Sequence, residues 1–423
     1  MFKVIKNERG VALMMVLGAL LILTTLVVEF AYNSHVGYDL AASQRDRLKA
    51  YYLARSGYNL ARLELKFEKD IRARYASLLK NLKGSGVTAD PLCKQIPLST
   101  GLLKGLSSGA LPGLAGGETT GEGEGAEKKE TPPPEDEDKP KFKETGEAVS
   151  GSEEFLNFDG DFAVDCDTEE RKLNLNVFRA DPLGTVTGAA PPPEGTLTPY
   201  DLQKELLFSL LSQKEYESIF EGKPDEIRKV VNSVADWADR DDRINESPGI
   251  SGGSEESEYD GLGYKPKNGK YTTIAELLLV HGVGDDLFKL LAPQVTVYGD
   301  NKINVCQASD EMIRAFVLRF ITATPGMAPI SLNDDEKWNA VIEAVHFACS
   351  EPSPQPAAVA AAIAPVIGAP TPAALAAQIT TTNRFYRIEA TGMAGESEAK
   401  IVAVIDASQP NPNLWKTLYF RVE

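Results

Sequence analysis

Acidic side chains gather in the stretch DWADRDDRINESPGISGGSEESEY, which covers residues 236–259. Four carboxylates leave the end of a predicted helix, and three more return after a glycine-serine turn: Asp236, Asp239, Asp241, Asp242, Glu255, Glu256 and Glu258. So many like charges close together repel one another unless a cation lies between them. Ca²⁺ takes six to eight oxygens from flexible carboxylates and carbonyls. The stretch therefore predicts a calcium site.

Within this acidic stretch, Asp236 is expected to cap the helix or to face solvent, and the expected ligands are Asp239, Asp241, Glu256 and Glu258. The spacing is not that of an EF-hand, because the pattern D-x-D-x-D-G with a glutamate at its end is absent. The alternative is a solvated acidic loop in which the neighbouring arginines, Arg240 and Arg243, supply partial counter-charges.

The chain has too few histidines for a histidine-based catalytic centre to be expected. The three histidines, His35, His281 and His346, lie in different sequence contexts. His281 stands beside a glycine hairpin and His346 on an apolar helix face, where structural histidines are common. The sequence contains no G-x-S-x-G and no H-E-x-x-H pattern. We therefore predict that the protein is not an enzyme.

The four cysteines form no C-x-x-C pair of the kind used for zinc or thioredoxin chemistry. An even number indicates disulfides in an oxidising compartment. The simplest pairing is local, Cys93 with Cys166 and Cys306 with Cys349, although four cysteines allow three connectivities.

The N-terminal segment carries eighteen uncharged, mostly apolar residues from Val11 to Val28. A helix of that length spans about 27 Å, close to the roughly 30 Å of a bilayer core. Three basic residues precede it, Lys3, Lys6 and Arg9, and by the positive-inside bias they keep the N-terminus cytoplasmic. No small-x-small cleavage site follows the apolar run. We expect a single-pass inner-membrane protein whose bulk lies in the periplasm if the cell is bacterial.

The helix does not stop where the membrane should end. Residues 41–82 contain no proline and are rich in helix formers. Leu60, Leu63, Phe67 and Ile71 repeat at three and four, which predicts an apolar stripe on a polar stem. A basic leader ending in Gly10, a membrane helix and an amphipathic stem together resemble the N-terminus of type IV pilins and pseudopilins. The resemblance implies that a prepilin peptidase cuts between Gly10 and Val11 and methylates the new N-terminus.

One position departs from that pattern. Pseudopilins generally carry glutamate at the fifth mature residue, which here is Met15. A carboxylate in lipid is costly unless it is paired. A subunit with no neighbour above it has no partner for this carboxylate and avoids the cost when the charge is absent, which is the pattern of the K-type minor pseudopilins.

Residues 116–151 combine glycine, proline and charge, which predicts a disordered acidic loop. Two short β-like runs follow it, over residues 162–165 and 173–178. A mainly helical block begins at the N-cap Thr198, and Ser309 is expected to cap a later helix of this block. Residues 351–377 are expected to be a partly helical Ala/Pro link. The tail returns to strands in NRFYRIEATGM, EAKIVAVIDAS and LWKTLYFRVE.

The order of KLNLNVF, DWADRDD, KPKNGKYTTIAELLLVHGV, NKINVCQAS and the closing strands resembles the type II secretion system minor pseudopilin K (general secretion pathway protein K) family. The expected fold is α+β, with a pilin-like N-terminal helix packed on an antiparallel sheet and an inserted all-helical domain. The expected parts are the leader (1–10), the helix and stem (11–90), the sheet part with its acidic loop (91–197), the inserted domain (198–380) and the closing strands (381–423).

The resemblance implies a subunit at the tip of the periplasmic pseudopilus that primes and caps the filament during protein export. Its partners would be the I- and J-type minor pseudopilins, the major pseudopilin, the prepilin peptidase and the inner-membrane secretion platform. The resemblance also implies calcium in the region of the acidic stretch, where K-type members can carry it.

The alternative is a membrane-anchored DNA-binding or DNA-uptake protein, because residues 271–306 resemble a helix-hairpin-helix. Asp285 and Asp286 follow the glycine hairpin, where phosphate would meet two carboxylates and only Lys289 compensates. The formal net charge of −17 also disfavours nucleic acid. We therefore expect no nucleic-acid partner.

Overall fold

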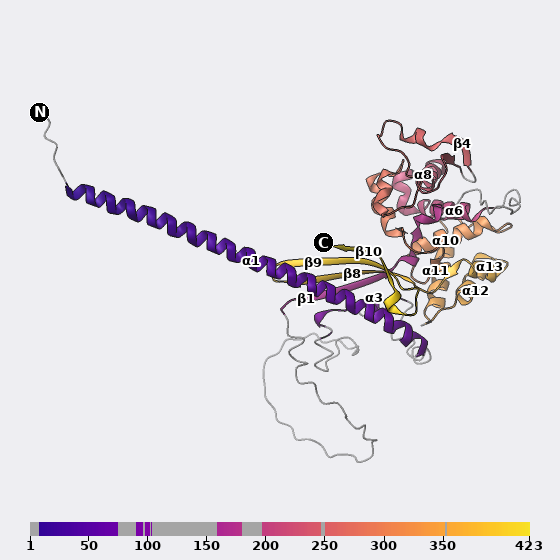
Figure 1. Ribbon diagram of the computed structural model, residues 1–423. Coiled ribbons are helices and arrows are strands. Elements are labelled where there is room, and N and C mark those ends of the chain that lie inside the picture. The colour runs from indigo at the N-terminus through magenta and orange to yellow at the C-terminus, as the bar shows by residue number, and fades with distance from the viewer. Residues whose placement is uncertain are drawn as a thin grey trace, which may run out of the picture.

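One long helix dominates the computed structural model, which describes residues 8–74, 90–95, 98–101, 103, 159–179, 197–246, 250–351 and 353–423 (Figure 1). Helix α1 runs from Glu8 to Arg74, and its 67 residues span about 100 Å. Most of the predicted leader, the end of the predicted stem and the predicted acidic loop at 116–151 lie outside the described residues.

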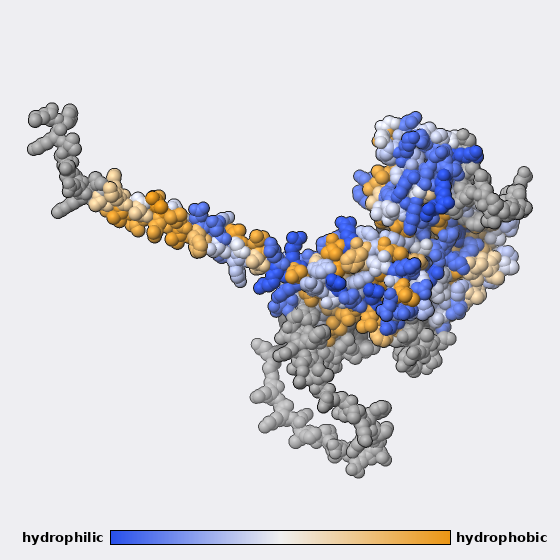
Figure 2. Space-filling model, in the orientation of Figure 1, coloured by the Kyte–Doolittle hydropathy of each residue, from blue (hydrophilic) through white to orange (hydrophobic). Residues whose placement is uncertain are grey.

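Among the described residues, none packs on the first half of α1. Every described side chain from Ala12 to Ala41 is exposed, although this part of the helix is almost entirely apolar up to Val28 (Figure 2). Among the described residues, α1 is the one helix that is long and apolar enough to cross a membrane, judged by length and composition. The prediction of one N-terminal apolar helix is therefore confirmed.

Four antiparallel strands form the main sheet, in the order β1-β8-β9-β10. Their bounds are Asp161–Thr168 for β1, Phe385–Ala394 for β8, Ser397–Asp406 for β9 and Lys416–Val422 for β10. Side chains alternate between a buried and a more exposed face in β1 and β8. The three closing strands expected from the tail are therefore present, and they pair with a strand from before the helical block.

The second half of α1 lies across this sheet through small side chains. Ala54, Ala61 and Leu65 are buried in one cluster with strand residues such as Ile388 and Ile401. A Cβ built on Gly392 of β8 would overlap the Ala50 carbonyl oxygen and the Ala54 nitrogen. Glycine therefore lets the helix backbone approach the strand directly.

The expected stripe on the stem was partly wrong. Leu63 and Phe67 are 46% and 49% exposed, and Leu60 is half-buried. Most side chains on the buried face are small instead, because α1 approaches the sheet closely. This face consists of Ala50, Ala54, Gly57, Tyr58, Ala61, Leu65 and Glu68.

Both disulfides are the pairs expected from the sequence. Cys93 in α3 (Leu92–Gln95) bonds to Cys166 in β1, with 5.8 Å between the Cα atoms. Cys306 bonds to Cys349 at the end of α11, with 5.3 Å between the Cα atoms. One bridge therefore lies in the sheet part and the other in the inserted block.

A mainly helical block lies between β1 and β8 and sits at the end of the sheet away from the N-terminus (Figure 1). Its α-helices are α6 (Pro199–Leu211), α7 (Glu217–Phe220), α8 (Pro224–Asp236), α9 (Asp285–Leu291), α10 (Asp310–Ala323), α11 (Asp335–Cys349), α12 (Pro356–Ile367) and α13 (Pro372–Ala376). Thr198 and Ser309 cap α6 and α10 through their side chains, as the sequence predicted for both.

The block also contains short strands and 3₁₀ turns, so it is not purely helical. Three two-stranded sheets pair β2 with β5, β3 with β4, and β6 with β7. The strand bounds are Leu173–Asn174 for β2, Arg243–Asn245 for β3, Ile250–Ser254 for β4, Val295–Thr296 for β5, Ile303–Asn304 for β6 and Ile379–Thr380 for β7. The 3₁₀ turns are η1 (Glu169–Arg171), η2 (Leu175–Arg179), η3 (Lys214–Tyr216), η4 (Glu255–Tyr259), η5 (Ile274–Leu279), η6 (Ala292–Gln294) and η7 (Pro412–Leu414), of which η7 precedes β10.

Two expectations for this block change in detail. The expected strand over residues 173–178 is only two residues long and continues as η2, because Leu175, Val177 and Phe178 all turn into the helical core. The Ala/Pro link forms two helices, α12 and α13, because Val359, Ile363 and Leu375 are fully buried in the same core. Tertiary burial decides both outcomes.

The block is fixed to the sheet by two glutamates in η1. Glu170 Oε1 accepts the backbone N–H groups of Arg384 and Phe385, at 2.7 and 3.0 Å. Glu169 Oε1 accepts from Arg387 Nε at 2.7 Å. The segment that enters the block is thus bonded to the segment that leaves it.

Candidate calcium site

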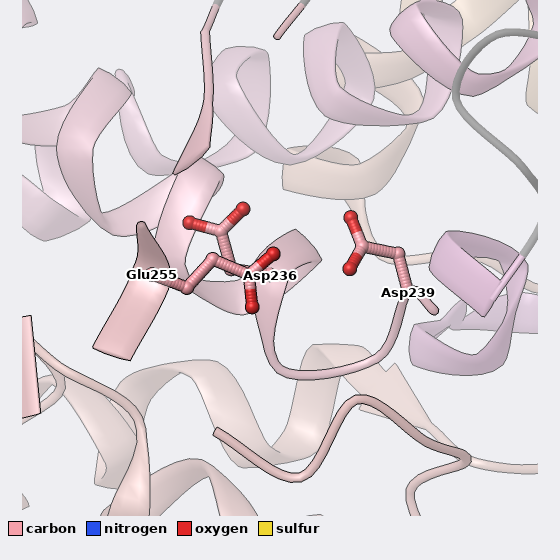
Figure 3. Close-up of side chains that lie close together, drawn as sticks. All are labelled: Asp236, Asp239 and Glu255. Atoms are coloured by element: carbon pink, nitrogen blue, oxygen red, sulfur yellow. The ribbon is translucent and has the colours of Figure 1, made fainter. Parts of the chain in front are cut away.

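Three carboxylates meet where α8 ends and the β3–β4 hairpin closes (Figure 3). Asp236 is the last residue of α8, and Asp239 follows in the turn that the Asp239 N–H closes on the Ala235 carbonyl at 3.0 Å. Glu255 opens η4 directly after β4, and its N–H donates to the Asp242 carbonyl at 3.3 Å. A helix end and a hairpin end therefore position the acids together.

The three side chains are buried and close. Asp236, Asp239 and Glu255 are 1%, 0% and 1% exposed. Each offers one carboxylate oxygen, and these oxygens lie within 4.8 Å of one another. Oxygens that bind one Ca²⁺ at about 2.4 Å lie at most about 4.8 Å apart. The separation therefore fits a shared calcium ion.

Polar neighbours satisfy only part of this cluster. Asn245 donates its backbone N–H and its side-chain amide to Asp236 Oδ1, at 2.8 and 2.6 Å, and the same amide donates to Asp239 Oδ2 at 2.8 Å. The Tyr200 hydroxyl donates to Asp239 Oδ2 at 3.1 Å. Within the described part of the chain, four buried oxygens have no hydrogen-bond donor: Asp236 Oδ2, Asp239 Oδ1 and both carboxylate oxygens of Glu255. A bound cation would satisfy such oxygens.

Burial disfavours the charged form of all three acids. It raises the pKa of Asp236 to about 7 and the pKa of Asp239 to about 7, against hydrogen bonds from Asn245 that lower both. Burial, with repulsion from Asp236 and Asp239, raises the pKa of Glu255 to about 9. Without a cation, the cluster therefore holds protons near neutral pH.

One buried lysine stands beside the cluster. Lys204 Nζ donates to Asn245 Oδ1 at 3.2 Å and to the Glu246 carbonyl at 2.5 Å, and it lies 3.3 Å from Asp201 Oδ1. Because Lys204 is shared with Asp201, it offsets at most one of the three charges. At least two negative charges remain when the acids are ionised, which suits a divalent cation.

The structure brings together a different set of acids from the one expected. Of the four expected ligands, only Asp239 lies in the cluster. Glu256 is exposed and pairs with Lys265 at 2.7 Å, Glu258 accepts from Ser233 at 3.1 Å, and Asp241 accepts from the Arg243 N–H at 2.9 Å.

Asp236, expected to face solvent or to cap a helix, is buried instead, and Glu255, which is not among the expected ligands, joins it in the cluster. Both follow from tertiary packing. Asp236 continues a helix end in which Ser233, Val234 and Ala235 are all buried. Glu255 and Tyr259 are the buried residues at the two ends of the 3₁₀ turn η4. The apolar end of α8 was the available sequence signal.

The hairpin expected at 271–306 is poorly suited to bind phosphate. It consists of η5, a turn at Gly282 with φ +80°, and α9. Asp285 and Asp286 are exposed at the start of α9, and Lys289 pairs with Asp286 at 3.3 Å. A phosphate would therefore meet two carboxylates at this turn.

A membrane-length helix that continues into a stem packed on an antiparallel sheet is the pilin-like arrangement expected from the sequence. Residues 172–300, which hold the candidate calcium site, match the family profile described as "Type II secretion system (T2SS), protein K". This match confirms the resemblance to minor pseudopilin K and supports a minor pseudopilin role in type II secretion.

No curated protein matches the chain. One solved chain that is similar to it comes from "The Crystal Structure of the GspK-GspI-GspJ complex from enterotoxigenic Escherichia coli Type 2 Secretion System". The identity is 16% and the TM-score is 0.40, over 63% of this chain and 80% of that chain.

Proposed function

We propose that this protein is a non-enzymatic minor pseudopilin at the tip of the type II secretion pseudopilus. There it assembles with I- and J-type minor pseudopilins, starts and caps the filament of the major pseudopilin, and serves protein export across the outer membrane. The observation that carries the proposal is the family match within the inserted block, residues 172–300.

The shape of α1 supports assembly with other subunits. Its apolar first half touches no other described part of the chain, so it is available to lipid and to the helices of neighbouring subunits. Cleavage between Gly10 and Val11 by the prepilin peptidase would leave Val11 as the N-terminus of this helix, in a bacterial inner membrane with the bulk of the chain in the periplasm.

Two features support a place at the tip. The helical block lies at the end of the sheet away from the N-terminus, where a subunit stacked above would meet it (Figure 1). Met15 stands at the fifth residue after the proposed cleavage, where a subunit inside the filament would place a carboxylate against its neighbour's amine. A subunit without such a neighbour has no partner for that carboxylate.

Intact-mass measurement tests the processing step. We compare cells that have the inner-membrane secretion platform and the prepilin peptidase with cells that lack the peptidase. The protein should begin at Val11 in the first and at Met1 in the second. A bulky residue at Gly10 should keep the leader attached and stop secretion. A mature chain that begins beyond Tyr32 would rule out the pseudopilin proposal.

Substitution at Met15 tests the position in the filament. Met15→Glu should give no gain in secretion and few copies per isolated filament, as for the unchanged protein. High copy number along the filament, or a marked gain from Met15→Glu, would place the subunit in the filament body instead.

We also propose that Asp236, Asp239 and Glu255 bind one Ca²⁺. Support comes from their four buried oxygens without donors and from their separation within 4.8 Å. Calorimetric titration of the full chain should give about one calcium per chain, with much weaker binding of Mg²⁺, which demands a tighter octahedral shell. The absence of heat from calcium in chelator-treated protein would reject the site.

A further inference from the structure

Within the described part of the chain, the last strand has an open edge. β10 is the edge strand, and of its seven residues only Tyr419 is partly covered. Among the described residues none bonds to its outer side. The opposite edge, β1, is covered, because Ser99 bridges to Ala163 and the Val164 N–H donates to the Leu98 carbonyl at 2.9 Å. Open edges accept further strands.

The backbone groups that point outward on β10 can be assigned from the ladder. Glu423 and Lys400 exchange both backbone hydrogen bonds, at 3.0 and 2.8 Å. In an antiparallel pair such bonded pairs alternate with unbonded ones. Arg421 therefore bonds toward β9 as Glu423 does, while Phe420 and Val422 present their N–H and C=O groups outward.

The same two residues carry exposed apolar side chains. Phe420 lies opposite Ala403 and Val422 opposite Ile401, whose side chains are buried on the α1 side of the sheet. Phe420 and Val422 are 47% and 46% exposed. The Phe420 ring lies 5.7 Å from the ring of Tyr58 in α1. Figure 2 shows apolar surface over this part of the sheet with hydrophilic surface around it.

Basic side chains on α1 line this apolar strip. Arg62 Nη2 lies 3.5 Å from the Pro412 carbonyl oxygen just before β10, and its guanidinium lies 5.8 Å from the centre of the Tyr58 ring. Arg55 and Lys66 stand seven residues before and four residues after Arg62, on the same flank of the helix.

The acids that the structure describes do not pair with these cations. Within the described part of the chain, no carboxylate forms an ion pair with Arg55, Arg62 or Lys66. The same is true of Lys416 at the start of β10 in this described part. Such a basic flank is notable in a chain of net charge −17. We call the combined surface the β10 edge surface; it consists of Arg55, Arg62, Lys66, Lys416, Phe420 and Val422.

We propose that the β10 edge surface binds an extended acidic segment of a partner polypeptide, which adds to β10 as a fifth strand. The partner backbone would bond to the outward groups of Phe420 and Val422. Its apolar side chains would cover those two residues, and its carboxylates would meet Arg62 and Lys66. Strand addition supplies affinity through the main chain and specificity through alternate side chains.

A short peptide tests this chemistry without knowledge of the natural partner. The probe is a fluorescein-labelled peptide of four Glu-Val repeats, titrated against the full chain in detergent micelles and followed by anisotropy. We expect saturable binding that weakens as salt rises, and at least about tenfold weaker binding of four Lys-Val repeats. Hydrogen exchange at the amides of Phe420 and Val422 should slow when the acidic peptide is bound.

Two variants separate backbone docking from charge. Val422→Pro removes an outward donor without removing a bond to β9, so peptide binding should fall at least about tenfold while the melting curve stays in place. The double variant Arg62→Ala, Lys66→Ala should weaken binding by about tenfold or more and flatten its salt dependence. Lys289→Ala, which removes a positive charge on the distant α9, should bind like the unchanged protein.

Several results would overturn the proposal. Equal binding of the acidic and basic peptides would remove the charge argument, and full binding by Val422→Pro would remove strand addition. Protection of the Phe420 and Val422 amides in the chain alone would mean that its own residues cover the strand. Protection that grows with protein concentration would mean that a second copy covers it instead of an acidic partner.

Discussion

The backbone N–H and the side-chain amide of Asn245 donate to the same carboxylate oxygen of Asp236, at 2.8 and 2.6 Å. That oxygen is saturated, while the other oxygen of Asp236 has no donor among the residues that the structure describes, although Asp236 is buried. Asn245 thus holds one oxygen of the carboxylate by two hydrogen bonds and leaves the other oxygen for a further partner. Asn245 therefore orients the proposed calcium site, whereas the carboxylates would bind the ion.

Calcium should stabilise the protein through these acids. At about a hundred times its dissociation constant it should add roughly 2.7 kcal/mol to the free energy of unfolding, if it binds only the folded state. For a block of this size the melting temperature should rise by roughly 5 to 10 °C. Thermal unfolding followed by circular dichroism, in millimolar calcium and in excess chelator, measures the difference.

Matched variants make this test specific. Glu255→Gln should abolish the calcium-dependent rise, whereas Glu256→Gln, at the exposed neighbouring position, should keep it. Loss of the effect in Glu256→Gln and not in Glu255→Gln would return the site to the ligands expected from the sequence.

Without calcium, stability should fall as pH rises from 5 to 8. Burial raises the pKa of Asp236, Asp239 and Glu255 above their unfolded values, so the folded state holds more protons in this range. The stabilising contribution is present below the unfolded pKa values and is lost as pH rises toward the folded ones, about 7 and about 9. Melting curves in chelator at several pH values measure this slope.

Calcium should flatten the slope, because the ion replaces the protons. Glu170 serves as an internal reference, since burial also raises its pKa to about 7 and it lies away from the cluster. The part of the slope that calcium leaves unchanged is therefore assigned to groups such as Glu170. A slope that calcium does not alter at all would contradict the cluster's role.

Elements with local signals were predicted well. The cap residues Thr198 and Ser309 marked two helices, and the alternating tail marked the closing strands. The ligand set was not predicted, because sequence density of carboxylates says nothing about which of them are buried. Asp236 and Glu255 enter the interior through the packing of α8 and Tyr259, and that packing depends on contacts distant in sequence. The face of α1 depends likewise on Gly392, which comes more than three hundred residues later.

Gly392→Ala should loosen the packing of α1 on the sheet. The added Cβ overlaps the backbone of α1 at Ala50 and Ala54, so one of the two elements must shift, at a cost of about 1–3 kcal/mol. Unfolding in urea and hydrogen exchange of α1 near Ala54 measure the effect. Gly269→Ala is the control, because its Cβ would make only ordinary contacts.

Removal of either disulfide should destabilise the chain. The bridges span 73 and 43 residues, and loop-closure entropy gives about 4 kcal/mol for each. The double variant Cys306→Ser, Cys349→Ser should lower the melting temperature of the helical block. Non-reducing peptide mapping of the unchanged protein should show the two local bridges, and a bridge between Cys166 and Cys306 would contradict the pairing.

The bond between Glu170 and the start of β8 has a consequence for the order in which the chain is made. β1 leaves the ribosome long before its partner β8, because the whole helical block is synthesised between them. Until then the small residues on α1, such as Ala54, have only β1 to pack on. A folded block brings the ends of β1 and β8 together and shortens the loop that must close. The second half of α1 should therefore keep its apolar face exposed until the block has been synthesised. Chaperones can bind the nascent chain during that time.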